Sequence, residues 1–124
     1  MSARTTCRQN SHEALTLACM HGANAVVVLG ACATANQGTG AAAVYGLKAL
    51  AQLAHDGAEL ALKAPTVEKM EDASTLYEQA IAVLNVVLDN GVGGELLFPS
   101  ETLMTLAKQT IDDAVSALAA EGSF

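Results

Sequence analysis

The sequence predicts an all-α protein, an antiparallel up-down-up-down bundle of four helices. Apolar residues make up 52% of the 124 residues but aromatic residues only 3%, so Leu, Val, Ile and Ala must fill the core, which suits close-packed helices. Four apolar segments of similar length are separated by stretches with Gly, Pro or Asn, which interrupt helices. Two of them carry apolar residues in alternating steps of three and four, the pattern of a bundle seam.

The first helix is expected over residues 11–35. Asn10 and Glu13 have the spacing of a capping box, in which each side chain accepts a hydrogen bond from the other residue's backbone amide. Residues 1–10 are polar and lack an apolar stretch, so they are expected to form a flexible N-terminal tail. A run of three valines favours extended backbone, but the apolar segment is too long for one strand. The sequence NQGTG at 36–40 ends the helix.

The second helix is expected over residues 40–64. Its polar residues recur every three or four positions and therefore form one stripe: Lys48, Gln52, His55, Asp56, Glu59 and Lys63. The opposite side is apolar and is expected to face the core: Ala43, Leu47, Leu50, Ala54, Gly57 and Ala61. Pro65 ends this helix, and Thr66 is suited to cap the next one.

The third and fourth helices, expected over residues 67–90 and 100–121, have the clearest seams. The third seam is Met70, Ala73, Tyr77, Ala80, Leu84 and Val87, and the fourth is Met104, Ala107, Ile111, Ala114 and Leu118. Gly91 suits the left-handed position after a helix, and Ser100 suits an N-cap. Helices of about 22 residues are about 33 Å long. The four expected helices can therefore lie side by side as one domain over residues 11–124.

The charge of the chain argues against nucleic acid and anionic membranes as partners. The formal net charge is −7 with six basic residues, and both partners require clustered Lys and Arg. The charge is also unevenly distributed. Residues 1–63 carry four basic and three acidic side chains, whereas residues 64–124 carry two basic and ten acidic ones. The second half of the chain therefore has a net charge of −8 and the first half a net charge of +1.

The cysteines point to a reducing compartment. Cys7, Cys19 and Cys32 are odd in number and have no paired spacing, so reduced thiols are expected. The first ten residues do not have the apolar stretch of a secretion signal. We therefore expect a cytoplasmic location.

No pattern in the sequence supports a metal or cofactor site. Glu-x-x-His, the motif of di-iron bundles, is absent from the sequence. His55 and Glu59 lie one turn apart but fall in the polar stripe, where a solvated pair is expected. Glu68 and Glu71 match only the first half of the magnesium motif of the all-helical nucleotide pyrophosphohydrolases. We therefore expect no metal, no cofactor and no catalytic residue, and an enzyme is not the favoured interpretation.

The loop before the fourth helix is the alternative location for a binding site. Residues 91–99 are long for a connection in a bundle and include three large apolar residues, Leu96, Leu97 and Phe98. These residues either cover the end of the core or line an apolar pocket for a small molecule. A small-molecule-binding protein or an enzyme with such a pocket, here or between helices, is therefore the second functional hypothesis.

The most unusual feature is an uncharged run. Residues 14–47 contain no Asp, Glu, Lys or Arg over 34 positions, so the first helix has two apolar faces, and only one of them can face the core. The other predicts an association surface, and a homo-oligomer, most simply a dimer, is expected. Which face points outward is left open. The candidate interface residues are Leu17, Met20, Asn24, Val28 and Ala31, with Val44 and Tyr45 from the second helix.

A membrane-spanning helix is the competing explanation of the uncharged run. Residues 17–35 approach the minimum length for a span, but His21 and Asn24 are costly in lipid, and no Lys or Arg flanks the segment. The favoured hypothesis is therefore a non-enzymatic, oligomeric helical protein, an adaptor or accessory protein whose expected partners are a second copy of itself and another protein.

Overall fold

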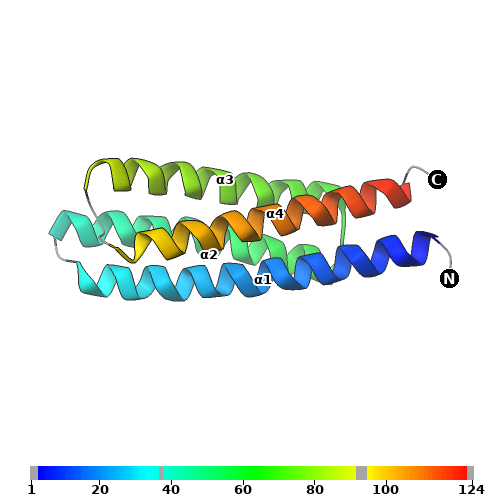
Figure 1. The fold of residues 1–124 in the computed structure, drawn as a ribbon, viewed down its shortest axis with the longest axis horizontal. Helices are drawn as coiled ribbons and strands as arrows, with labels where there is room; N and C mark the ends of the chain where they lie inside the picture. The colour runs from blue at the N-terminus through cyan, green and yellow to red at the C-terminus, as the bar shows by residue number, and fades with distance from the viewer. Residues whose placement is uncertain (1–2, 37, 92–94, 123–124) are drawn as a thin grey trace.

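The four predicted helices are present and pack into one bundle. The computed structural model describes residues 3–36, 38–91 and 95–122, and within them the helices are α1 (Ala3–Ala35), α2 (Gly38–Lys63), α3 (Val67–Asp89) and α4 (Leu97–Gly122). Successive helices run in opposite directions (Figure 1). Each helix packs against the next, and α4 closes the ring with an extensive contact to α1. The predicted fold class, an all-α four-helix bundle, is confirmed.

Every helix turns one seam with alternating steps of three and four toward the core. All residues of these inner seams are buried. In α1 the inner seam is Ser11, Leu15, Ala18, Gly22, Ala25, Leu29 and Cys32, and in α2 it is Val44, Leu47, Ala51, Ala54, Ala58 and Ala61. In α3 it is Met70, Ala73, Tyr77, Ala80, Leu84 and Val87, and in α4 it is Leu97, Ser100, Met104, Ala107, Ile111 and Ala114. The predicted seams of the last two helices are confirmed, except that Leu118 is only partly buried.

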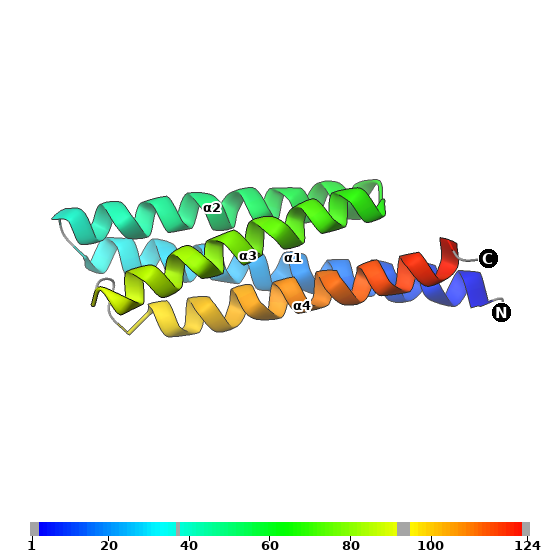
Figure 2. The same cartoon turned by 90° about the horizontal axis from the view of Figure 1, so that it is seen from above.

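The core consists mainly of small aliphatic residues. Alanine is the most frequent residue of the inner seams, and Tyr77 is the single aromatic residue buried among the residues that the structure describes. Small side chains at the contacts allow helix axes to approach closely. The bundle is therefore slender, and its four helices lie almost parallel to one long axis (Figures 1 and 2).

The first helix begins earlier than expected. It starts at Ala3, and Asn10 lies inside it, so the predicted capping box at Asn10 is wrong. Residues 3–9 contain neither Gly nor Pro, and nothing in them ends a helix. The last turns of α4 run beside the first turns of α1 in both views (Figures 1 and 2).

The third helix is capped as predicted. Thr66 has extended backbone, and its hydroxyl accepts a hydrogen bond of 3.2 Å from the backbone N–H of Lys69. Gly91, just after the C-cap residue Asn90, has φ of +69°, the left-handed conformation that glycine adopts without strain. Both ends of α3 are thus encoded locally, its start by Thr66 and its end by Gly91.

The start of the fourth helix differs from the expectation. It begins at Leu97, and Ser100 lies within its first turn, where its hydroxyl donates a 3.0 Å hydrogen bond to the Leu96 carbonyl oxygen. Ser100 is therefore not the N-cap. Pro99 does not delay the helix because the first amides of a helix have no intrahelical acceptor.

Candidate functional site

Helix α1 carries a second seam on the side that faces away from the core. This outer seam consists of Leu17, Met20, Asn24, Val27 and Ala31, which again follow steps of three and four, and all five residues are exposed. It is displaced from the inner seam by two positions, or about 200° around the helix axis. Its large side chains are 45% exposed at Leu17, 50% at Met20 and 71% at Val27. The structure therefore leaves an apolar strip in solvent.

The corresponding outward positions of the other helices carry charges. Two positions after the residues of their inner seams, the exposed charged residues are Asp56 and Lys63 in α2, Asp72 and Asp89 in α3, and Asp113 in α4. The same offset from Ser11 in α1 gives Glu13, but the positions that follow it, from Leu17 to Thr34, carry no charge. A solvated face of this kind is normal for a helix at the surface of a bundle. Among the described helices, α1 thus has the longest stretch of outward positions without charge. The two apolar faces that the sequence predicts for this helix correspond to an inner face and an outer face.

Four of the predicted interface residues lie in the outer seam. Leu17, Met20, Asn24 and Ala31 are exposed there, and Tyr45 is exposed on the adjacent helix α2. Val28 is only half-buried at the flank of the strip. These residues therefore remain candidates for a contact surface.

The assignment of Val44 to the interface is not kept. Val44 belongs to the inner seam of α2 and is fully buried in the core, so it has no surface to offer a partner. Val27 was missed by the sequence analysis, which followed steps of four from Asn24 to Val28. The alternation of three and four from Leu17 onward leads to Val27 instead.

Helix α1 also meets the simplest criterion for a membrane span. The segment Asn10–Ala35 contains an 18-residue window with a mean hydropathy of 1.7, and the segment is long and apolar enough to cross a bilayer, by length and composition alone. Such a segment is equally typical of a core helix. In the folded bundle this helix uses its inner seam for the core, so the apolar surface that remains for any partner is the outer seam.

The three predicted ligand-binding residues do not share an environment. Leu97 is fully buried as the first residue of the α4 inner seam, whereas Leu96 and Phe98 are exposed. Residues 92–94 of the predicted lid lie outside the described part of the chain. The structure therefore brings no shared apolar site together from Leu96, Leu97 and Phe98.

A buried polar cluster lies between α1, α2 and α3. The ring of Tyr77 reaches across the core from α3 to its diagonal neighbour α1, where its hydroxyl occupies the space above Gly22. A Cβ atom at position 22 would overlap the Tyr77 hydroxyl oxygen and would lie 3.2 Å from His55 Cδ2. The absence of a side chain at Gly22 is therefore what admits Tyr77 and His55.

The polar atoms of this cluster are poorly satisfied. The Tyr77 hydroxyl and His55 Nδ1 are buried and have no hydrogen-bond partner among the described residues. Burial is the main cause that raises the pKa of Tyr77, and the negative charges of Cys19, once that thiol ionises at high pH, and of Asp56 raise it further. Burial and the charge of Glu59 also raise the pKa of Cys19. Both groups are thereby kept protonated, which is the opposite of what an activated nucleophile requires.

His55 is more buried than its place in the polar stripe suggested. Its side chain is only 12% exposed, and its Nε2 lies 3.0 Å from Glu59 Oε1. The predicted His55–Glu59 pair is present, but it is half inside the bundle because Gly22 leaves room for the imidazole ring. Within the described residues, no three or more His, Cys, Asp and Glu side chains are placed to hold a metal ion together.

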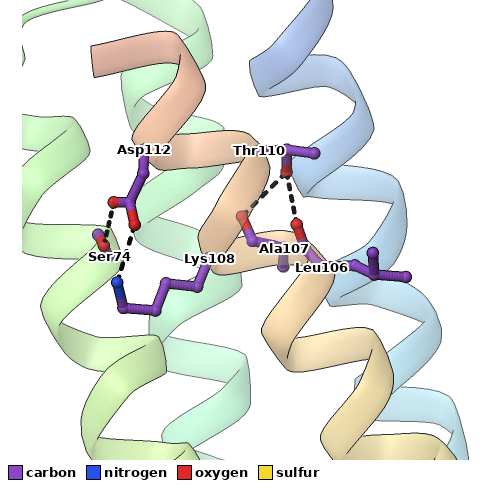
Figure 3. Close-up of polar contacts among 6 residues, drawn as sticks. All are labelled: Ser74, Leu106, Ala107, Lys108, Thr110 and Asp112. Atoms are coloured by element: carbon purple, nitrogen blue, oxygen red, sulfur yellow. Dashed lines mark hydrogen bonds and ion pairs between the residues drawn. The ribbon is translucent and has the colours of Figure 1, made fainter. Parts of the chain in front are cut away.

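A second polar group joins α3 to α4 along a shallow groove of about 420 Å³. Ser74 Oγ donates a 2.7 Å hydrogen bond to Asp112 Oδ1, and Lys108 Nζ lies 2.8 Å from Asp112 Oδ2 (Figure 3). Glu71, Thr75, Val115 and Ser116 complete the lining. The sequence analysis missed this contact because Ser74 and Asp112 are 38 residues apart. The hydrogen bond from Ser74 to Asp112 connects α3 to α4.

The Asp112 contact predicts a pH dependence of stability. Partial burial by itself raises the pKa of Asp112, but hydrogen bonds from Lys108 and Ser74, with the Lys108 charge, outweigh it, so the pKa is lowered overall. A carboxyl group whose pKa is lower in the folded protein than in the unfolded chain stabilises the fold at pH values above its unfolded-state pKa. This stabilisation is lost as the pH falls through the folded-state pKa. We expect the stability advantage of the parent protein over Asp112→Asn to shrink between about pH 5 and pH 2.

Urea titrations at several pH values measure this advantage directly. Ser74→Ala, which removes one donor but keeps the carboxyl group, should show part of the same loss of pH dependence. A stability difference between parent and Asp112→Asn that stays constant over this range contradicts the assignment.

Comparisons with known protein families, with curated proteins and with solved structures find no match to this chain. A functional proposal therefore depends on the geometry and chemistry of its own residues.

Proposed function

We propose that the protein is a non-enzymatic helical interaction protein that associates with itself through the outer seam of α1. One observation carries this proposal: α1 exposes a strip of Leu17, Met20, Val27 and Ala31 around Asn24, and no charged residue interrupts it. Contiguous exposed apolar surface on a soluble protein favours association. The buried polar cluster and the α3–α4 groove, by contrast, have internal structural roles.

The distribution of charge favours a second copy of the chain as the partner. The half of the chain that forms α3 and α4 has a net charge of −8, whereas the half with α1 and α2 has +1. Covering the outer seam with α3 or α4 of another copy would remove carboxylates from water without a partner, which is costly. Placing the outer seam of α1 against the same seam of a second copy removes no charged side chain of either seam from water. An isologous contact of this kind closes as a dimer.

The outer seam of α1 is too small to form a whole dimer interface by itself. Residues 14–34 of α1 extend over about 32 Å, and a helix about 10 Å wide presents roughly 320 Å² along this length. A standard interface buries about 800 Å² on each partner. The remainder is expected from the helices on either side of α1, where Tyr45 of α2 and Leu106 of α4 are exposed large apolar residues. The contact is thus between two bundles lying side by side.

Sedimentation velocity at micromolar concentration tests the proposal. The parent protein is expected to sediment as a dimer. Val27→Lys should give a folded monomer, because the ammonium group would be removed from water at the centre of the contact. Circular dichroism verifies that the variant keeps its helices, which is expected because Val27 is exposed in the isolated bundle.

Val86→Lys is the matched control. Val86 is also an exposed helical valine, at 60% exposure, but it lies in the last turn of α3. This variant should dimerise like the parent protein. A parent protein that remains monomeric overturns the proposal, and so does equal dimerisation of both lysine variants. Flotation of a monomeric parent protein with phosphatidylcholine vesicles would identify lipid as the partner instead.

A further inference from the structure

We infer that Asn24 fixes the alignment of the two α1 helices in the dimer, an inference that rests on the proposed function. Asn24 is the central residue of the outer seam. Leu17 lies seven positions before it and Ala31 seven positions after it, while Met20 and Val27 occupy the intervening positions. The seam is therefore two heptads of apolar residues with one polar residue in the middle.

The central position has a consequence for symmetry. The uncharged part of α1 covers residues 14–35, and its midpoint is next to Asn24. When two such strips overlap over their full length about a two-fold axis, Asn24 of one copy meets the Asn24 of the other, whichever direction the second helix runs. Any other alignment shortens the apolar overlap and places Asn24 opposite Leu17, Met20, Val27 or Ala31.

The chemistry of the amide makes this alignment the favoured one. A carboxamide carries two N–H donors and one carbonyl acceptor, so two facing asparagine side chains satisfy each other. An asparagine that faces an apolar side chain in a dry contact has no such partner. In helical seams a single buried asparagine selects register and number of chains, and it does so at the expense of affinity. Asn24 has the position and surroundings for this role.

Replacement of Asn24 by an apolar residue separates specificity from affinity. In Asn24→Leu the seam becomes apolar throughout, so dimerisation should tighten by at least about tenfold. Species larger than the dimer should also appear, because helices can then slide by a heptad without leaving an amide unpaired. Sedimentation velocity over a concentration series gives the dissociation constant, and native mass spectrometry counts the chains.

Asn85→Leu is the matched control, since Asn85 is an exposed helical asparagine on α3, away from the outer seam. It shares the gain in helix propensity and the added surface leucine, and it should leave the dissociation constant and the number of chains unchanged. Equal affinities and an unchanged dimer for Asn24→Leu overturn the inference. If Val27→Lys still breaks that dimer, the proposed association surface stands and only the role of Asn24 is lost. A monomeric parent protein would remove both.

Discussion

Leu84→Asp is expected to unfold the protein. Leu84 is completely buried in the inner seam of α3, between Ala80 and Val87. An aspartate there has no cation within the inner seams, which consist of apolar residues, glycine and serine, so the substitution buries an unpaired charge and empties part of the core. Such changes cost about 4 kcal/mol or more, a large part of the 5–15 kcal/mol that typically stabilises a domain.

The matched control is two residues away on the same helix. Val86→Asp introduces the same carboxylate at a position that is 60% exposed, where a surface change usually shifts stability by about 0.5 kcal/mol or less. Far-ultraviolet circular dichroism should show the helical spectrum of the parent protein for Val86→Asp and its loss for Leu84→Asp. Equal helicity and equal melting temperatures would show that the assignment of the buried face of α3 is incorrect.

Gly22→Ala is expected to destabilise the bundle although alanine is the better helix former. The added methyl group would occupy the space of the Tyr77 hydroxyl, and the backbone of α1 or the tyrosine ring must move. Overpacking of this kind costs about 1–3 kcal/mol, against a gain of about 1 kcal/mol in helix propensity. Gly46→Ala provides the reference, because Gly46 is exposed and its Cβ would meet nothing within 4 Å. That variant should be stabilised by the propensity gain alone.

The Tyr77 hydroxyl should account for most of the difference between the two glycines. Tyr77→Phe removes a buried hydroxyl that has no hydrogen-bond partner among the described residues, so this substitution alone should be neutral or stabilising. Combined with Gly22→Ala it should restore about 1–2 kcal/mol, measured as the coupling free energy of a double-mutant cycle from urea titrations. Additive effects in that cycle would contradict the contact.

The fold was largely predictable because its seams are local in the sequence. Met70 to Val87 in α3 repeat in steps of three and four, and all six residues are buried. The ends were less predictable. Asn10 with Glu13 has the pattern of a capping box, yet helix α1 continues through it because nothing before Asn10 stops a helix. Capping motifs describe what a helix start looks like, but they do not oblige a helix to start there.

The candidate surface was predictable only in part. The uncharged run identified α1 as the helix with two apolar faces, but the inner and outer faces can be distinguished only once the neighbouring helices are in place. The structure assigns Leu15 to the core and Leu17 to solvent. The contacts of Gly22 with Tyr77 and of Ser74 with Asp112 join residues far apart in sequence. The periodicity of apolar residues within one helix does not predict contacts between side chains of different helices.

The side-by-side placement of the first turn of α1 and the last turn of α4 has a consequence for anything attached to the chain. Both views show these turns at the end of the bundle that also contains the α2–α3 connection (Figures 1 and 2). A polypeptide joined before α1 or after α4 therefore leaves the bundle at the same end. The opposite end, with the α1–α2 and α3–α4 connections, stays uncovered. A fluorescent protein should therefore lie at the same end of the bundle whether it is fused before α1 or after α4. For the same reason, a short linker should suffice to connect α4 to α1 in a circular permutant.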